Sequence, residues 1–346
     1  MPKLLPRRSF ISYATQSAVT LGLFGKITAS YAGTFKQVPK RIGIIGLDTS
    51  HSIAFAKALN GPNPSAAYAG FSVSAAYPRG SADIESSVKR IAGYTEEVKK
   101  LGIEIVGSID ELLLKSDFIL LETNDGRPHL AQAKEVIKAG KPVFIDKPVA
   151  ATLSDVISIY GLAQKYKVPI FSSSSLRYME TAQEVANGKI GQVFGADTYS
   201  PATLEKTHPD LFWYGIHGVE ILYTVMGKGC KELIRVSTPD TEIVVGTWAD
   251  GRTGTFRGTR TGKHDYGGTA YGEKGNLVLG PFKGYDNLLD QIIAFFKSGI
   301  PPVSAEETLE LYTFMEAADE SKRNGGKAVQ LADVYAKHNN IAQNRL

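Results

Sequence analysis

The stretch from Lys40 to Ser52, KRIGIIGLDTSHS, has the residue types and spacing of an anion-binding turn. An apolar run typical of a buried parallel strand precedes the turn, and residues 53–59 follow it with the pattern of a helix. Free backbone N–H groups and the dipole at the start of a helix favour a bound anion. The candidate ligand-binding residues of this turn are Gly43, Gly46, Asp48, Thr49, Ser50 and His51.

The glycine pattern of this turn is incomplete. Dinucleotide-binding turns usually follow G-x-G-x-x-G, whereas Asp48 and His51 stand at two of the aligned positions. Asp48 would repel a pyrophosphate unless its carboxylate is turned away or bonded to the helix N-terminus. The motif alone fits either a nucleotide site or a plain strand-to-helix turn. A cation at residues 48–51 is disfavoured because a helix N-terminus repels cations, and we expect no metal site.

The turn after the second predicted strand bears on the choice of cofactor. Residues 71–77 have a strand pattern, and residues 78–81 lack the acidic residue that often binds ribose hydroxyls in dinucleotide sites. Arg79 and Ser81 would suit a 2′-phosphate better, which favours NADP over NAD. The alternative is a surface turn with a solvated arginine.

Strand and helix patterns alternate through the first half of the chain. Further strands are predicted at residues 103–106, 118–121, 142–145 and 169–172, with helical patterns between them. This alternation predicts an α/β domain over residues 40–174 with a Rossmann-like, doubly wound parallel sheet. Ligands of such sheets bind at the carboxyl ends of the strands. Polar loops at 122–129 and 146–148 follow two of those strands and supply the candidates Thr123, Asn124, His129, Asp146, Lys147 and Pro148.

The pattern changes from residue 175 onward. Helices are predicted at 178–187, 212–226, 288–297 and 305–322, and short strands separated by glycine turns at 192–199, 232–237, 241–248, 254–259, 268–271 and 275–279. Asp250-Gly251 is a hairpin signal between two of these strands. Residues 175–346 are therefore predicted to form an α+β domain with a mostly antiparallel open sheet.

Composition limits the class of protein. A chain of 346 residues is long enough for two domains, and 43% hydrophobic with 21% charged residues indicates a globular protein. The net charge of +4 is small and spread along the chain, which gives no reason to expect nucleic acid as a partner. The single cysteine, Cys230, excludes an internal disulfide framework, and we expect it to be buried or half-buried.

The first 32 residues resemble a twin-arginine export signal. Arg7-Arg8 precede a modestly apolar run, and Ser30-Tyr31-Ala32 supply small residues at a cleavage point. Residues 33–39 have the composition of a linker. We therefore expect passage through the twin-arginine translocase in folded form, with the cofactor already tightly bound, into the periplasm. The alternative is a disordered basic tail.

Three blocks of the chain resemble the Gfo/Idh/MocA family, the glucose–fructose oxidoreductase and inositol dehydrogenase group. The first runs from His129 to AGKPVFIDKP at 139–148, where Asp146 replaces the usual glutamate; the second is GIHGVE at 215–220, and the third lies between residues 295 and 329. The resemblance implies an NAD(P)-dependent oxidoreductase acting on a sugar or polyol. It also implies a homodimer or homotetramer formed through the second sheet.

The same resemblance implies roles for individual residues. Lys147 would face the nicotinamide and polarise a substrate hydroxyl or carbonyl, and His217 would be the general acid/base. Pro148 would shape the turn that aims Lys147, through a cis bond as in relatives. Thr123, Asn124 and His129 would lie near the nicotinamide ribose, although His129 also fits a backbone-bonded role. The candidate substrate contacts are Arg177, Tyr178, Trp213 and His217, with a structural role equally open for the first two.

One departure from the family concerns the residue four places before His217. An aspartate is common there, and this chain has Trp213. Glu220 and Asp210 are the candidates to substitute for the missing carboxylate. Two alternatives to the oxidoreductase therefore stay open: a glycosidase of the same fold that retains NAD, and a binding protein that has lost turnover.

Overall fold

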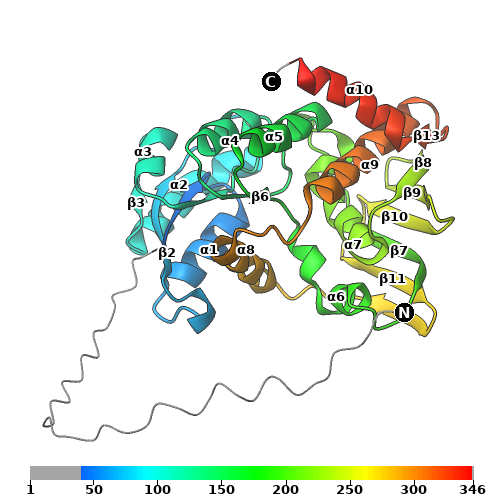
Figure 1. Ribbon diagram of the computed structural model, residues 1–346, viewed down its shortest axis with the longest axis horizontal. Helices are drawn as coiled ribbons and strands as arrows, with labels where there is room; N and C mark the ends of the chain where they lie inside the picture. Colours follow the sequence, from blue (N-terminus) through cyan, green and yellow to red (C-terminus); the bar gives the residue numbers. More distant parts are fainter. Residues whose placement is uncertain (1–39, 345–346) are drawn as a thin grey trace, which may run out of the picture. The chain divides into compact units, whose positions relative to one another are not determined.

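The computed structural model describes residues 40–344 (Figure 1). They form one compact unit that contains two β-sheets. The predicted export signal and linker, residues 1–39, lie outside the described residues. No helix of the described part is long and apolar enough to cross a membrane.

The first sheet has six strands in the order β3-β2-β1-β4-β5-β6, and every pair is parallel. The strands are β1 (Lys40–Ile45), β2 (Phe71–Tyr77), β3 (Glu104–Ile105), β4 (Phe118–Leu121), β5 (Val143–Ile145) and β6 (Ile170–Phe171). The strand order reverses between β1 and β4. In a doubly wound sheet this switch point is where ligands bind, just beyond the carboxyl ends of the strands.

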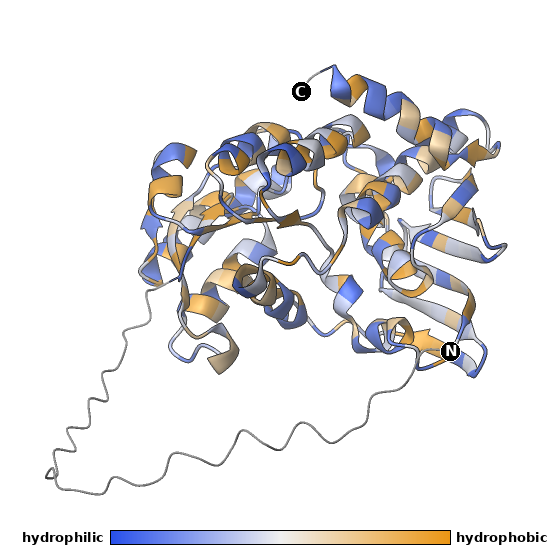
Figure 2. Ribbon diagram, in the orientation of Figure 1, coloured by the Kyte–Doolittle hydropathy of each residue, from blue (hydrophilic) through white to orange (hydrophobic). Residues whose placement is uncertain are grey.

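Helices cover both faces of the first sheet, which explains why its strands are apolar runs. These helices are α1 (Ser50–Asn60), α2 (Glu85–Lys100), α3 (Ile109–Leu114), α4 (His129–Lys138) and α5 (Leu153–Tyr166). Ile44 packs into one buried cluster and its neighbour Ile45 into another, as expected for alternate side chains of one strand. In Figure 2 the strands of this sheet are mostly orange, whereas the surrounding helices carry both colours.

The second sheet has seven strands in the order β12-β11-β7-β10-β9-β8-β13. The strands are β7 (Val193–Pro201), β8 (Cys230–Ser237), β9 (Thr241–Trp248), β10 (Thr253–Thr259), β11 (Gly267–Gly272), β12 (Gly275–Leu279) and β13 (Val329–Gln330). Only the β7–β10 pair is parallel. The predicted fold class, a doubly wound parallel sheet followed by a mostly antiparallel sheet, is therefore confirmed.

The remaining helices are α6 (Glu180–Ala186), α7 (Ile216–Met226), α8 (Asp286–Ser298), α9 (Ala305–Arg323) and α10 (Leu331–Gln343). In Figure 1, α7 and α9 lie on the side of the second sheet that faces the first sheet. Helix α8 instead packs on the first sheet, since Leu288, Ile292 and Phe295 share a buried cluster with Ile42 and Ile44. The chain thus returns to the first sheet after completing most of the second.

Some elements differ from the sequence prediction. The predicted helix 212–226 begins with a π-helical turn, Leu211–Gly215, and becomes α-helical only at Ile216. The predicted helix 178–187 is a short 3-10 turn, Ser175–Tyr178, followed by α6. Strand β13 and helix α10 were not predicted. Cys230 is buried, as expected.

Candidate active site

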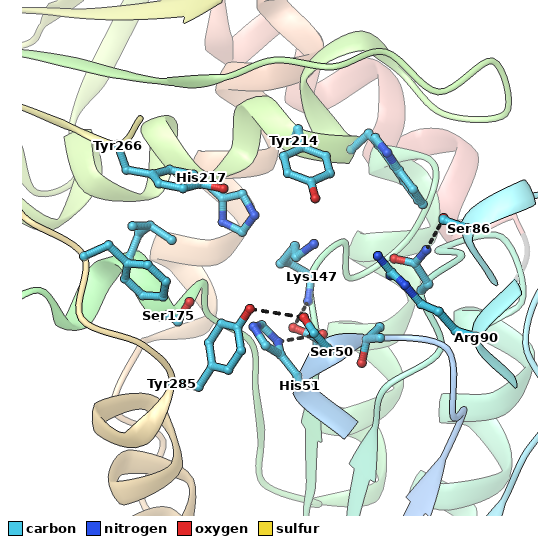
Figure 3. Close-up of a pocket in the computed structure, with 16 residues that line it drawn as sticks. Ser50, His51, Ser86, Arg90, Lys147, Ser175, Tyr214, His217, Tyr266 and Tyr285 are labelled. Carbon is cyan, nitrogen blue, oxygen red and sulfur yellow. Dashed lines mark hydrogen bonds and ion pairs between the residues drawn. The ribbon is translucent and has the colours of Figure 1, made fainter. Parts of the chain in front are cut away.

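A cavity of about 220 Å³ lies at the carboxyl ends of β1 and β5, at the switch point of the first sheet (Figure 3). Both halves of the chain line it. The first half contributes Thr49, Ser50, His51, Ser86, Arg90, Asn124, Asp146 and Lys147. The second contributes Ser175, Leu176, Trp213, Tyr214, His217, Tyr266, Phe282 and Tyr285. The cavity therefore combines residues from loops that are far apart in the sequence.

Lys147 and His217 point into this cavity from different elements (Figure 3). Lys147 follows β5, and the Lys147–Pro148 peptide bond is cis. Its Nζ lies 5.4 Å from the centre of the Tyr214 ring. His217 is the second residue of α7, directly after the π-helical turn that carries Trp213 and Tyr214. A substrate between the two walls can reach an ammonium group and an imidazole together.

His217 is held as a neutral imidazole. Burial, together with the nearby Lys147 and His51, lowers its pKa well below the ordinary value of 6.5. Its Nδ1 lies 2.7 Å from the Ser174 hydroxyl, which can donate or accept a hydrogen bond. The imidazole can therefore present a proton-accepting nitrogen to the cavity near neutral pH.

The start of α1 forms one wall of the cavity. Thr49 caps the helix by accepting a hydrogen bond from the Ser52 backbone N–H at 3.1 Å, and no acidic residue lies in the first turn. The hydroxyl of Ser50 lies 3.1 Å from that of Tyr285. A helix N-terminus without acidic residues attracts anions. Arg90 of α2 adds a second positive group to this wall.

His51 and Asp146 form a buried pair beside Lys147. His51 Nδ1 lies 2.9 Å from Asp146 Oδ2, and the other carboxylate oxygen accepts the Lys147 backbone N–H at 2.8 Å. Although burial opposes it, the proximity of His51 and Lys147 holds the pKa of Asp146 below its ordinary value. His51 also contacts the Phe55 and Tyr285 rings. The histidine at the altered glycine position thus links the first turn to the end of β5.

Sequence reasoning missed Glu122, which completes this cluster. It follows β4 directly and is fully buried, and its Oε2 accepts a hydrogen bond from the Thr49 hydroxyl at 3.3 Å. Potential ligand atoms of His51, Glu122 and Asp146 lie within 4.8 Å of one another. Burial and the neighbouring Asp146 raise the pKa of Glu122 well above its ordinary value, which favours its protonated form. An acidic residue directly after an apolar strand was the available signal.

Asp48 turns away from the helix terminus. Its Oδ1 accepts the Asn124 backbone N–H at 3.0 Å and its Oδ2 accepts that of Ser81 at 3.4 Å. Burial raises the pKa of Asp48, although these bonds oppose the change. The carboxylate therefore joins the loops that follow β2 and β4.

Several residues predicted to bind the cofactor do not line the cavity. The Arg79 side chain is exposed, and the Ser81 hydroxyl donates to Asp83 at 2.6 Å. His129 is buried, with its ring nitrogens 3.2 Å from the Val149 carbonyl oxygen and 2.8 Å from that of Thr123. This placement matches the backbone-bonded role left open above. The Thr123 hydroxyl donates to Gln132 at 3.1 Å. Asn124 does reach the cavity.

Close packing explains why Gly43 and Gly46 carry no side chain. A Cβ on Gly43 would lie 2.4 Å from the Ser116 hydroxyl oxygen. Gly46 has a φ of +93°, and a Cβ there would lie 2.5 Å from the Thr123 backbone nitrogen. These contacts account for both glycines without reference to a ligand.

Arg177 is engaged in a buried ion-pair network. Its guanidinium lies 2.5 Å from Glu220 and 2.6 Å from Glu307. Neither Arg177 nor Tyr178 lines the cavity, whereas Trp213 does. Asp210 pairs with the buried Arg235 and with Lys322, away from the cavity. Neither Glu220 nor Asp210, the two acids considered as substitutes for the aspartate absent at Trp213, therefore reaches the cavity.

Comparison with known proteins identifies the family. Residues 40–174 match the family model described as "Oxidoreductase family, NAD-binding Rossmann fold", which is named GFO_IDH_MocA. Residues 40–174 therefore form the NAD-binding domain of the Gfo/Idh/MocA family. A curated relative, the uncharacterized oxidoreductase YhhX of Escherichia coli, is 22% identical over 141 residues. That match spans 36% of this chain and 40% of the relative's length.

Solved structures of two dehydrogenases share the fold. A probable dehydrogenase from Thermotoga maritima has a TM-score of 0.69 and 22% identity, covering 85% of this chain and 99% of its own. A scyllo-inositol dehydrogenase from Lactobacillus casei, solved with NAD(H) and scyllo-inositol, has a TM-score of 0.65 and 18% identity over the same shares. The predicted family is confirmed. Since both solved structures are less than 25% identical to this chain, they show the shared fold.

The charges of this site suit one end of a nicotinamide nucleotide. The N-terminus of α1 and Arg90 would attract a phosphate, and Lys147 would lie near the reacting oxygen. The adenosine half would extend toward the loop after β2, where Asp48 and Ser81 close the space. The volume of about 220 Å³ lies below the roughly 300–1,000 Å³ usual for pockets that enclose a drug-sized ligand.

Proposed function

We propose that this protein is an exported, nicotinamide-dependent oxidoreductase that transfers a hydride to or from a carbon of a sugar, polyol or related carbohydrate. The supporting observation is that Lys147 and His217 line one cavity beside the N-terminus of α1. The nicotinamide, when bound, supplies or accepts the hydride. The residues of this chain bind and orient both partners and manage the proton.

Lys147 and His217 have separate roles in that reaction, charge stabilisation and proton transfer. The Lys147 ammonium would stabilise the negative charge that develops on the reacting oxygen. His217, neutral because it is buried, would accept the proton of the substrate hydroxyl in the oxidation direction. Ser174 can hold the opposite ring nitrogen of His217 while that proton moves.

The remaining walls of the cavity suit a carbohydrate. Trp213, Tyr214 and Tyr266 offer ring faces for the apolar side of a sugar, and their polar atoms can bind its hydroxyls. This mixture of aromatic surface and a few polar groups is typical of small-molecule sites. The structure carries no observation that favours a glycosidase over an oxidoreductase.

Turnover tests this proposal. The purified protein is incubated with inositols, aldoses and uronic acids in the presence of NAD, NADP or nicotinamide mononucleotide, and the absorbance of reduced nicotinamide is followed.

Lys147→Ala should lower kcat/KM by about 10²–10³-fold and His217→Ala by about 10²–10⁴-fold. Lys263→Ala and His264→Ala are matched controls on an exposed turn and should keep full activity. Full activity of His217→Ala would refute the assigned role.

The export and cofactor proposals have separate tests. Arg7→Lys with Arg8→Lys should retain the full-length chain in the cytoplasm, and cell fractionation measures this. A shortened periplasmic form of that variant would exclude the twin-arginine route. Mass spectrometry of nucleotide released on denaturation tests tight cofactor retention. The preference for NADP over NAD stays a prediction. Arg79 and Ser81, the residues on which it depends, do not line the cavity.

A further inference from the structure

We propose that the cavity selects a nicotinamide mononucleotide-sized ligand, because a latch centred on Asp48 closes the groove that would hold the adenosine half of NAD. The latch comprises Asp48, Ser81, Asp83, Asn124 and Arg127. The inference rests on the proposed function, since it assumes that the cavity takes a nicotinamide. It deepens that function by naming the size of the ligand.

The first part of the latch is the Asp48 carboxylate. It stands at the second position of the glycine fingerprint, where a backbone without a side chain normally lets the pyrophosphate approach. Asp48 is fully buried and accepts the backbone N–H groups of Asn124 and Ser81. A Cβ on Gly80 would lie only 2.1 Å from Asp48 Oδ2, so the loop after β2 presses directly on the carboxylate. Carboxylate and backbone occupy the space between the two loops.

The second part of the latch is Arg127, which lies in the loop after β4. Its guanidinium donates to Asp83 at 2.9 Å and to the Ser81 hydroxyl at 3.2 Å, both in the loop after β2. It also donates to Asp125 of its own loop at 2.9 Å. Arg127 therefore connects the same two loops that Asp48 connects, through a second set of hydrogen bonds. An adenosine between them would have to break both sets of bonds.

The space left open is the cavity itself, which Asp48 does not line. Arg90 of α2 and His217 lie on opposite sides of Lys147, and Ser50 at the start of α1 lies beside Lys147 (Figure 3). Arg90 is anchored by donating to the Asp48 carbonyl oxygen at 3.3 Å. One phosphate at the helix N-terminus beside Arg90 would leave the nicotinamide pointing toward Lys147. A second phosphate would meet the loops joined by Asp48.

Calorimetric titration of the folded protein with nicotinamide mononucleotide, NAD and ADP-ribose tests this inference without any need for turnover. We expect the wild type to bind the mononucleotide at least about tenfold more tightly than NAD, and ADP-ribose most weakly. Asp48→Gly restores the second glycine and should tighten NAD at least about tenfold, leaving the mononucleotide within about twofold. Thermal unfolding of each variant checks that it is folded.

Arg127→Ala provides a second route to an open groove if Asp48→Gly does not fold. It should also tighten NAD selectively. Arg252→Ala is the matched control, since Arg252 bonds Asp250 two residues before it, as Arg127 bonds Asp125, but lies in a hairpin of the second sheet. Arg252→Ala should change neither ligand's affinity.

The outcomes separate this inference from the proposed function. Tighter binding of NAD than of the mononucleotide by the wild type would overturn the latch and leave the oxidoreductase intact. Unchanged NAD affinity in both Asp48→Gly and Arg127→Ala would do the same. Failure of every nicotinamide ligand to bind the wild type and both variants would overturn the latch together with the proposed function.

Discussion

Asp48 and His51, which replace glycines in the first turn, each bond to other residues of the protein. Asp48 accepts backbone N–H groups of two loops, and His51 pairs with Asp146 at 2.9 Å. Both side chains are buried in places where the usual fingerprint keeps space open for a cofactor. The altered motif therefore reshapes the site and does not merely weaken it.

His208 is a residue whose titration can be tested through stability. Its Nε2 accepts the Gly126 backbone N–H at 3.0 Å, and Nδ1 lies 2.9 Å from the Thr207 hydroxyl. Burial lowers the pKa of His208 to about 4, below its ordinary value of 6.5. The unfolded chain therefore binds the proton more tightly than the folded protein between these values. This contribution to stability is complete above pH 6.5 and is lost as the pH falls toward 4.

We predict that His208→Gln removes this part of the pH dependence. The free energy of unfolding, measured with urea at several pH values, should fall less steeply with acid in the variant. The difference from wild type should reach at most about 1.4 kcal/mol per pH unit. His264→Gln, on an exposed ring, should follow the wild-type curve. Parallel curves for wild type and His208→Gln would show that His208 titrates normally.

Residue types near strand ends were predictable, whereas their partners were not. Lys147, His217 and Asn124 were selected from the sequence, and the structure brings all three to one cavity. Arg177 was selected on equal grounds but is paired with two glutamates. Those glutamates lie 43 and 130 positions after Arg177 in the sequence, so no local pattern could indicate the pairing.

At the scale of elements, strong local signals gave the best predictions. The predicted strands 71–77, 118–121 and 241–248 match the structure residue for residue. One of the helices between the strands, α3, is capped by Ser108, which accepts the Glu111 backbone N–H at 3.1 Å. Helix α10 has no side-chain N-cap bond and few buried residues, so its sequence carried little signal. Tertiary packing on α5 and α9 stabilises it instead.

Helix α7 must approach the second sheet closely in order to present His217. Gly218 makes this possible, since a Cβ there would lie 2.4 Å from the ring of Phe256 in β10. Phe256 is fully buried, so its ring can move only if its neighbours repack. We predict that Gly218→Ala lowers the free energy of unfolding by about 1–3 kcal/mol through overpacking.

Gly93 in α2 is the matched control, because no atom lies within 4 Å of a Cβ added there. Gly93→Ala should raise the free energy of unfolding by about 0.4–1 kcal/mol, since alanine favours a helix and restricts the unfolded chain. Urea unfolding measures both variants. A stabilised Gly218→Ala protein would mean that α7 can move away from β10 at no cost.

At the scale of the whole molecule, the second sheet leaves one face without covering helices in the described part of the chain. Cross-strand pairing places Val236, Ile243 and Tyr199 in one row of that face, with Arg257 between the last two. A second row runs from Ile234 and Val245 through Thr255, Asp197 and Thr269 to Val278. Val278 is 71% exposed and Val236 62% exposed. Exposed apolar side chains gathered among polar ones on one open face are typical of an interaction surface.

We propose that this face joins two copies of the chain, as predicted from the family resemblance. A stable interface buries roughly 1,200–2,000 Å² in total, which an open seven-stranded sheet can supply from each partner. Val236→Asp with Val278→Asp would place charges without partners in the interface, which is strongly destabilising. The dissociation constant should therefore rise at least tenfold, as measured by size exclusion with light scattering over a dilution series. Val88→Asp is the control, because Val88 is 53% exposed but lies on α2, away from the sheet. A monomeric wild type, or equal dissociation of the Val88 variant, would show that this face is not the interface. Dissociation of the Val236 and Val278 variant alone would assign assembly to the second sheet. Each copy would then keep its own cavity at the first sheet.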